Sequence, residues 1–455
     1  MPEPEPFRIK MIEPLTLLSR EERLKRIRSV GYNVFKLRAR DVYIDMLTDS
    51  GTSAMSDLQW AKMLTTEQAY AGSTSFELLE ESVADILGFP QFLPVHQGRA
   101  AENILFSLTV RDGDFVPNNM HFDTTYANVK HKGGTPVNLV VDEAYRPGQE
   151  GDFKGNMDIS KLRDFIDETG SEKIPVIMLT VTNNTAGGQP VSMENIREVS
   201  EVAKEHDIPF FLDACRFAEN SYFIKSREKG YENVPIRDIV REMFSYADGF
   251  TFSAKKDGLA NIGGILGVRD LELHKKAVEL GIVIEGFPTY GGMACRDLAA
   301  IAQGLREATD PEYLRYRHQQ VKYLGDRLDD AGVPISKPVG GHAVFVDGKE
   351  FLPHIPQVQF PAQALTAELY VEGGIRGVEL GTSAFGETDE DGNVIPATLE
   401  YMRMAIPRRV YTLTHLDYVA DTVISLYHRR DDIKGLERTY APKLLGHFMS
   451  EFKPL

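Results

Sequence analysis

The chain has 455 residues, of which 42% are hydrophobic and 26% charged, a composition typical of a globular protein that buries a large core in two or three domains. The formal net charge of -16 argues against a nucleic-acid partner, which requires a basic face. The only cysteines, Cys215 and Cys295, imply neither a disulfide framework nor a cysteine metal site. With no signal peptide pattern and no long apolar run, we expect a cytoplasmic protein without a membrane partner.

The first part of the chain shows only short patterns. Three early prolines disfavour a helix in residues 1–18, which we expect to form an extended arm. A charged helix is expected over 21–30, and weak alternation over 42–47 indicates a strand. The segment 74–87 places its apolar residues on one helical face and stops before Gly88, so it predicts an amphipathic helix.

From residue 92 onward, strand and helix patterns alternate. Strands are expected at 92–95, 137–141, 174–181, 208–212, 246–252 and 265–268. Helices are expected over 98–109 and after the N-cap Ser192. The run 174–181 is almost wholly apolar, as a strand covered on both faces should be. The alternation predicts an α/β fold with a mainly parallel sheet and helices on both sides.

The chain changes character near residue 311, where charge increases and long apolar runs become fewer. We therefore expect a large domain over 56–310. Segments 19–55 and 311–455 are expected to form a smaller α+β domain that closes over the first.

Four of the predicted strands end in polar residues. The polar residues at these strand ends are His96-Gln-Gly-Arg99, Asn183 with Asn184, Asp213 followed by Arg216, and Ser253 followed by Lys256. In parallel sheets, ligands bind beyond the carboxyl ends of the strands. Because core packing alone rarely brings so many polar groups to one edge, the sequence predicts a binding site there.

Lys256 lies just past a strand end, three residues after Ser253. This arrangement suits an aldehyde cofactor, because the amine condenses with the aldehyde and the hydroxyl binds the cofactor phosphate. Pyridoxal phosphate (PLP) is held in this way. Taken alone, the pair Lys255 and Lys256 also fits a solvated surface loop. A Ser-x-x-Lys pattern occurs in penicillin-binding enzymes too, but their Ser-Asp-Asn and Lys-Thr-Gly partner motifs are absent here.

The remaining rim residues have roles that suit this cofactor. Gln97 and Gly98 open a helix whose free backbone N–H groups favour a phosphate, and Arg99 adds a permanent charge. Asp213 follows an apolar run and would need a buried partner, either a protonated pyridine nitrogen or Arg216. Phe122 offers a ring that could stack on the cofactor, although most phenylalanines are core residues.

Longer motifs extend from residue 5 to the C-terminus. They are Tyr43-Ile-Asp, Leu47-Thr-Asp-Ser-Gly51, Ala69-Tyr-Ala-Gly-Ser73, His96-Gln-Gly-Arg99, Ala186-Gly-Gly-Gln-Pro-Val-Ser-Met193, Ser253-x-Lys-Lys-Asp257, Gly340-Gly-His-Ala-Val-Phe345 and Arg408-Arg-Val-Tyr-Thr412. On these motifs the whole chain resembles the β-eliminating lyases, a family of PLP enzymes. The resemblance implies the aminotransferase-like fold (fold type I), a homotetramer and an amino acid as the small-molecule substrate.

The resemblance also implies roles for individual residues. Lys256 matches the lysine that holds PLP, and Asp213 the partner of the pyridine nitrogen. The residues that bind the cofactor phosphate in the family match Gln97, Gly98, Arg99 and Ser253. Asn184 and Arg216 match the groups near the ring hydroxyl. Phe122 matches the aromatic residue that stacks on the ring. Tyr70 matches a catalytic tyrosine. The substrate carboxylate site matches Arg403, with Ser50 and Asn184 nearby.

Two positions depart from the family pattern. The family binds a potassium-type cation through backbone oxygens near Gly51 and Asn261 and through a glutamate, and this chain has Gln68 at the glutamate position. A neutral amide attracts a cation less strongly, yet we still expect a monovalent cation. Ala100 replaces a usual glycine, which is a small steric change.

Three positions bear on the leaving group. Asp123 matches family members that release indole from L-tryptophan, where members that release phenol from L-tyrosine have threonine. Leu380 replaces the arginine that phenol-releasing members place against the phenol hydroxyl. His447 resembles a C-terminal histidine of the indole-releasing members. The resemblance therefore implies β-elimination of L-tryptophan to indole, pyruvate and ammonium.

Each of these three positions also has a plainer interpretation: Asp123 as a turn cap, Leu380 as core and His447 as a surface histidine. The alternatives at the level of function are the release of phenol from L-tyrosine, an aminotransferase of related fold, and a PLP-binding relative without activity. Because Lys256, Asp213 and Arg403 are all present, the last of these is disfavoured.

Overall fold

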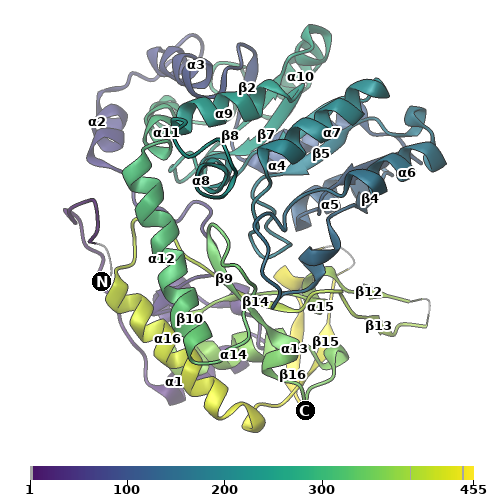
Figure 1. The fold of residues 1–455 in the computed structure, drawn as a ribbon. Coiled ribbons are helices and arrows are strands. Elements are labelled where there is room, and N and C mark those ends of the chain that lie inside the picture. Colours follow the sequence, from purple (N-terminus) through teal and green to yellow (C-terminus); the bar gives the residue numbers. More distant parts are fainter. Residues whose placement is uncertain (1–3, 390, 443–444) are drawn as a thin grey trace. The chain divides into compact units, whose positions relative to one another are not determined.

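The computed structural model describes residues 4–389, 391–442 and 445–455 (Figure 1). It divides into two compact units. Unit 1 comprises the chain up to Asp49, Tyr145–Glu150 and His318–Leu455, and unit 2 comprises Ser50–Ala144 and Gly151–Arg317. The boundary near residue 317 falls inside the helix α12 (Pro311–Asp330). No helix of the described residues is long and apolar enough to cross a membrane.

Unit 2 is built on a five-stranded sheet in the order β2-β8-β7-β6-β5. Its strands are β2 (Phe92–Val95), β5 (Ile177–Thr180), β6 (Phe210–Asp213), β7 (Gly249–Ser253) and β8 (Gly264–Val268). Strands β5, β6 and β7 are parallel, and β8 runs antiparallel to both β7 and β2. A further parallel pair joins β3 (Phe115–Asn118) and β4 (Thr135–Asn138). The predicted mainly parallel sheet is confirmed, with β8 as its reversed strand.

Helices cover both faces of this sheet, so its strands contribute to two cores. In β5, Ile177 and Leu179 belong to one buried cluster and Met178 to another. In β6, Leu212 and Phe211 divide in the same way. Since successive strand side chains point to opposite faces, a strand buried on both sides must be apolar throughout. This explains the continuous apolar runs in the sequence.

The helices of unit 2 are α2 (Asp57–Thr65), α3 (Thr74–Leu87), α4 (Gly98–Thr109), α5 (Asp123–His131), α6 (Ile159–Thr169), α7 (Met193–Glu205), α8 (Phe217–Arg227), α9 (Ile236–Ser245), α10 (Leu271–Ile284) and α11 (Cys295–Ala308). They include the three helices predicted for this unit, α3, α4 and α7, and seven that the sequence analysis did not predict. Ser192 caps α7, as predicted, by accepting a hydrogen bond from Asn195 N. The bounds predicted for α3 and α4 are confirmed.

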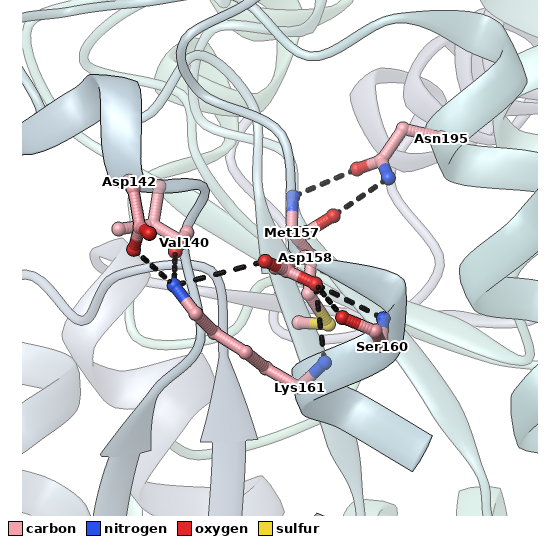
Figure 2. A network of polar contacts seen from close by, with 7 residues as sticks. All are labelled: Val140, Asp142, Met157, Asp158, Ser160, Lys161 and Asn195. Carbon is pink, nitrogen blue, oxygen red and sulfur yellow. Dashed lines mark hydrogen bonds and ion pairs between the residues drawn. The ribbon is translucent and has the colours of Figure 1, made fainter. Parts of the chain in front are cut away.

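A polar network fastens α6 to its neighbours (Figure 2). Asp158 caps the helix by accepting a hydrogen bond from Lys161 N at 3.1 Å. The ammonium of Lys161 donates to Val140 O at 3.1 Å. Asn195, on α7, bonds both backbone groups of Met157 at 2.8 Å. Buried backbone groups outside a sheet need such partners, and the network fixes the connection after β4.

Unit 1 contains a three-stranded antiparallel sheet in the order β11-β14-β9. These strands are β9 (Ala343–Asp347), β11 (Val378–Leu380) and β14 (Tyr401–Ala405). The other elements are α1 (Arg20–Ser29), β1 (Ile44–Asp45), α13 (Gly348–Phe351), α14 (Pro361–Gly373), β10 (Ile375–Arg376), α15 (Thr382–Phe385), β12 (Glu387–Thr388), β13 (Val394–Ile395), α16 (Leu413–His428), β15 (Leu436–Tyr440) and β16 (Glu451–Pro454). Three further strand pairs stand apart from this sheet. Strands β1 and β10 pair in parallel, whereas β12 with β13 and β15 with β16 pair antiparallel. The unit is α+β in character.

The run 174–181 forms only β5, Ile177–Thr180, so the predicted strand was too long. Two further predicted strands are shortened by their neighbours. The run 42–47 forms only β1, Ile44–Asp45, because its partner β10 offers two residues for pairing. The run 246–252 begins its strand at Gly249, since α9 continues to Ser245 and Tyr246 caps it. In both places the strand ends were set by neighbouring elements, which periodicity does not report.

Candidate active site

The polar edge of the sheet in unit 2 brings Gly98 against Ser253. A Cβ on Gly98 would lie 2.8 Å from Ser253 Cβ, closer than real side chains approach, so only glycine fits there. Gln97 is the N-cap of α4 but its side chain does not cap the helix, so the helix N-terminus can receive an anion. Among the described residues, Ser253 Oγ is buried without a hydrogen-bond partner. Arg99 follows on the exposed side.

Lys256 lies in the turn that follows β7, and its neighbours anchor this turn. Asp257, 2% exposed, accepts hydrogen bonds from Ala218 N at 2.8 Å and Glu219 N at 3.2 Å, the first-turn groups of α8. A carboxylate at a helix N-terminus is favoured by the helix dipole. Burial lowers the pKa of the Lys255 amine, and the charge of Lys256 lowers it further. The hydrogen bonds of Asp257 therefore anchor the turn directly after Lys256.

Asp213 ends β6 and is buried, at 5% exposed. It pairs in register with Thr180 on β5 and Thr251 on β7, so it lies between two strands at the sheet edge. Burial raises the pKa of the Cys215 thiol, and the nearby charge of Asp213 raises it further. Arg216, at the N-cap of α8, is buried as well.

Asn184 follows β5 in a tight turn, where its carbonyl accepts hydrogen bonds from Gly187 N and Gly188 N at 3.2 Å each. The Asn184 side chain is 3% exposed. Phe122 is the N-cap of α5 and Asp123 its first residue. Asp123 is 6% exposed, and its Oδ1 accepts a hydrogen bond from Thr124 N at 2.6 Å.

These residues fit PLP on observations of this structure. The buried Ser253 hydroxyl lacks a partner, the uncapped N-terminus of α4 lies against it, and a cradle that only glycine permits lies between them. A buried carboxylate, Asp213, can hold a protonated ring nitrogen. Lys256 supplies the amine. The chain thus provides a phosphate cradle, an acidic partner and a lysine in one unit.

Ser50 and Gly51 begin unit 2 and are tied to the lysine loop. Gly51 N donates to Lys255 O at 2.7 Å, and Asn261 Nδ2 donates to Gly51 O at 3.1 Å. The two predicted backbone cation ligands, at Gly51 and Asn261, are therefore adjacent. Gln68 Oε1 instead accepts a hydrogen bond from Cys295 N at the start of α11. Across the described residues there is no cluster of three or more His, Cys, Asp or Glu side chains that could hold a metal.

Tyr70 differs from the other predicted site residues in its exposure, which is 72%. Its ring contacts Tyr290 and Phe287, with ring centroids 5.3 and 5.7 Å apart. A hydrogen bond with Tyr290 raises the pKa of the Tyr70 phenol, and the charge of Tyr290 adds to this.

In unit 1, two predicted substrate residues share one face of a sheet. Val378 pairs with Arg403 and Leu380 pairs with Tyr401 across β11 and β14. Directly paired residues, and residues two apart on one strand, point to the same face. Arg403 and Leu380 therefore face the same side. Both are nearly buried, at 5% and 3% exposed, and Arg403 Nη2 donates to Leu47 O at 2.9 Å.

Arg376 is a second buried arginine in unit 1. Its guanidinium makes a two-pronged ion pair with Asp45, with Nε 3.0 Å from Oδ1, and it also donates to Leu37 O. Because these bonds occupy its guanidinium, Arg376 has a structural role. His447, 5% exposed, lies 5.6 Å from the Phe35 ring and 4.0 Å from the Phe448 ring, measured between ring centroids. His447 is thus buried among aromatic rings, which excludes the interpretation of a surface histidine.

Two buried glutamates flank the segment that carries Leu380. A Cβ on Gly381 would lie 2.6 Å from Glu400 Cδ and 2.9 Å from Glu379 Oε1. Glu400 accepts hydrogen bonds from Thr382 N, Thr382 Oγ1 and Gln357 Nε2. Among the described residues, Glu379 Oε2 has no partner. Burial raises the pKa of Glu379 well above its usual value, and the charge of Glu400 raises it further.

This pair predicts that unfolding depends on pH. Because the folded state holds a proton on Glu379 that the unfolded state releases near pH 4.5, stability is lost as pH rises above that value. Glu379→Gln keeps the shape and needs no proton. Between pH 5 and pH 8 the midpoint of thermal unfolding should therefore fall less in the variant, by about 2–4 °C, the shift that roughly 1 kcal/mol produces in a domain of 150–250 residues.

Calorimetry of both proteins at several pH values measures this difference. Glu437→Gln, at an exposed position of β15, is the control for losing a surface charge. A parallel fall in Glu379→Gln and the parent protein would contradict the assignment.

Sequence reasoning missed two residues near this site. Asp257 anchors the lysine turn, and its signal was its place directly after Lys255 and Lys256. Glu102 lies one helical turn after Gly98 and is buried. A glutamate directly after Ala100 and Ala101 was the only sign, and it does not reveal what the side chain binds.

Comparison with known proteins agrees with this geometry. The family model described as β-eliminating lyase matches residues 45–422. The chain is 51% identical to the tyrosine phenol-lyase of Pasteurella multocida, over 99% of this chain and 98% of that protein. It is 52% identical to the tryptophanase of Salinibacter ruber, over 99% of this chain and 95% of that protein.

Solved structures with low identity share the fold. An aromatic aminotransferase from Pyrococcus horikoshii has a TM-score of 0.59 at 15% identity, covering 91% of this chain and all of that chain. A serine palmitoyltransferase from Sphingomonas wittichii has a TM-score of 0.62 at 12% identity, covering 91% of this chain and 97% of that one. The fold is the aminotransferase-like α/β fold of PLP enzymes, and the chain belongs to the PLP-dependent β-eliminating lyase family.

Proposed function

We propose that this lyase acts on L-tryptophan and releases indole, pyruvate and ammonium. Overall identity does not decide between tryptophan and tyrosine, because relatives of both kinds are about equally similar. The observation that carries the proposal is Leu380, which is apolar, 3% exposed and on the same sheet face as Arg403. An apolar side chain there suits an indole and leaves a phenol hydroxyl without a partner, which a binding site discriminates against strongly.

Asp123 supports the same substrate. The indole N–H is only a donor, and a carboxylate is only an acceptor when ionised. Asp123 is buried at the start of α5, directly after the Phe122 that is expected to stack on the cofactor. His447 adds a polar ring within an aromatic cluster. The three positions belong to separate segments of the chain, so their agreement on indole is independent evidence.

Each of the predicted site residues has a separate role in the proposed reaction. When bound, PLP supplies an electron sink that stabilises negative charge next to the amino group. Arg403 holds the substrate carboxylate as a planar, two-pronged partner, and Ser50 and Asn184 are expected to assist. Lys256 takes the proton from the α-carbon. Asp213, fixed in the sheet edge, keeps a proton on the ring nitrogen.

Tyr70 is proposed to give a proton to the leaving ring in the site of a second copy. Its 72% exposure supports this placement, since a catalytic phenol needs enclosure that this chain alone does not give it. The proposal includes a homotetramer. It also includes a monovalent cation, bound near Gly51 and Asn261 with weaker help from Gln68.

A comparison of L-tryptophan and L-tyrosine tests the function. In one potassium buffer, kcat/KM for tryptophan, measured as indole and pyruvate released, should exceed kcat/KM for tyrosine by at least about tenfold. Ammonium should appear in equal amount with pyruvate, which excludes an aminotransferase. A preference for tyrosine, with phenol as the product, would overturn the substrate and identify the chain as a phenol-releasing member.

A further inference from the structure

Glu102 is a buried carboxyl that no step above uses. It lies in the second turn of α4, four residues after Gly98, so both residues point to the same face of the helix. The side chain is 6% exposed. Burying a carboxylate is costly unless it is hydrogen-bonded, so its partners indicate its role.

Both carboxylate oxygens of Glu102 bind α5. Thr125 Oγ1 donates to Glu102 Oε1 at 2.6 Å, and Asn128 Nδ2 donates to Glu102 Oε2 at 3.3 Å. Thr125 is fully buried. Asn128 Nδ2 also donates to Thr124 O at 3.0 Å, which ties the first turn of α5 together.

The turn held in this way begins with Phe122 and Asp123. Asp123 Oδ1 accepts the hydrogen bond from Thr124 N, so the direction of its carboxylate depends on where that turn lies. On the other side, the start of α4 packs on Ser253 in the phosphate cradle. Glu102 is thus the polar link between the helix that cradles the phosphate and the helix that presents Phe122 and Asp123.

Charged residues of the candidate active site act on the Glu102 carboxyl. Burial raises its pKa to about 7, and the charge of Asp213 contributes to the increase. Hydrogen bonds from α5 and the charge of Lys256 act in the opposite direction.

We propose that Glu102 is a positioning residue that fixes the start of α5, and through it Phe122 and Asp123, relative to the phosphate-binding end of α4. The proposal rests on the proposed function, in which Asp123 accepts the indole N–H. Glu102 itself does not touch the leaving group. Its loss should therefore affect substrates with a ring leaving group more than substrates without one.

A double-mutant cycle tests this proposal in the PLP-loaded enzyme. Thr125→Val removes the hydroxyl with little change of shape, and Glu102→Leu removes both acceptor oxygens. Each single variant should lose about 10- to 100-fold in kcat/KM for L-tryptophan and less than about threefold for S-methyl-L-cysteine, whose leaving group is a small thiolate. The double variant should be no more than about threefold worse than the poorer single variant, because both substitutions break the same link.

Two further variants keep the result decisive. Glu102→Gln retains an acceptor for Thr125 and should recover most of the tryptophan activity. If Glu102→Leu does not fold, Thr125→Val alone carries the test through its selective loss on L-tryptophan. Glu228→Gln is the matched control, because this half-buried carboxylate accepts hydrogen bonds from Met193 N and Glu194 N at the start of α7, away from α4 and α5 in the sequence. It should leave the ratio of the two substrates unchanged.

Several results would overturn the proposal. Equal losses on both substrates, together with weaker PLP binding measured by equilibrium titration, would mean that Glu102 acts on the cofactor. Losses that multiply in the double variant would mean that Glu102 and Thr125 act separately. If the parent enzyme prefers tyrosine, the proposed function fails, and the same cycle run with L-tyrosine still decides whether Glu102 positions α5.

Discussion

Replacing Lys256 with alanine should lower kcat by about four orders of magnitude or more while the protein still binds PLP. The phosphate cradle, which includes Gly98 and Ser253, does not involve the lysine, so affinity for the cofactor phosphate should persist. Turnover should not persist, because the amine that takes the α-proton is missing and general acid–base catalysis by a positioned group contributes large factors.

The neighbouring lysine provides the matched control. Lys255 Nζ lies 3.4 Å from Gln97 Oε1 and occupies the same turn, so Lys255→Ala removes an equal charge one residue away. It should weaken PLP binding modestly and retain most of kcat. Borohydride reduction of the loaded enzyme followed by peptide mapping should find the cofactor on Lys256. A label on Lys255, or full activity in Lys256→Ala, would show that the lysine was misassigned.

Sequence patterns predicted the helices, caps and strands that are determined by residues close together in the chain. The helix starting at Thr74 and the cap at Ser192 follow from side-chain periodicity and a serine that can bond its own helix. The doubly buried strands follow from unbroken apolar runs. The rim residues follow from the rule that strand ends meet at one edge of a parallel sheet, and Gly98 and Ser253 do lie in contact.

Other features depend on partners far away in the sequence, and no local pattern reports them. Arg376 and Arg403 both lie among apolar residues in the sequence, and only the ion pair with Asp45 separates their roles. Glu102 is one glutamate among many until Thr125, 23 residues later, donates to it. Glu379 and Glu400 are separated by 20 other residues, and their mutual effect exists only because both pack on Gly381. The reversed direction of β8 likewise arises from pairing.

The choice of leaving group should change most when Asp123 is altered. Asp123→Thr removes the acceptor for the indole N–H at a position that is 6% exposed. Leaving a buried donor unpaired costs about 1–3 kcal/mol, which corresponds to a loss of roughly 5- to 150-fold in kcat/KM for L-tryptophan. Asp123→Asn retains one acceptor oxygen without the charge, so its loss should be intermediate.

A second substitution, at Leu380, should extend the change in substrate specificity. Leu380→Arg places a donor where a phenol hydroxyl needs one, on the sheet face it shares with Arg403. Combined with Asp123→Thr, it should raise kcat/KM for L-tyrosine by about tenfold and lower the value for tryptophan further. Leu380→Met keeps an apolar side chain of similar volume and should change neither value by more than about threefold.

Steady-state kinetics with both amino acids measure the change, and S-methyl-L-cysteine reports whether the general machinery survives. A fall on all three substrates would indicate damage to the site, not altered specificity. Full tryptophan activity in Asp123→Thr would remove Asp123 from the indole site.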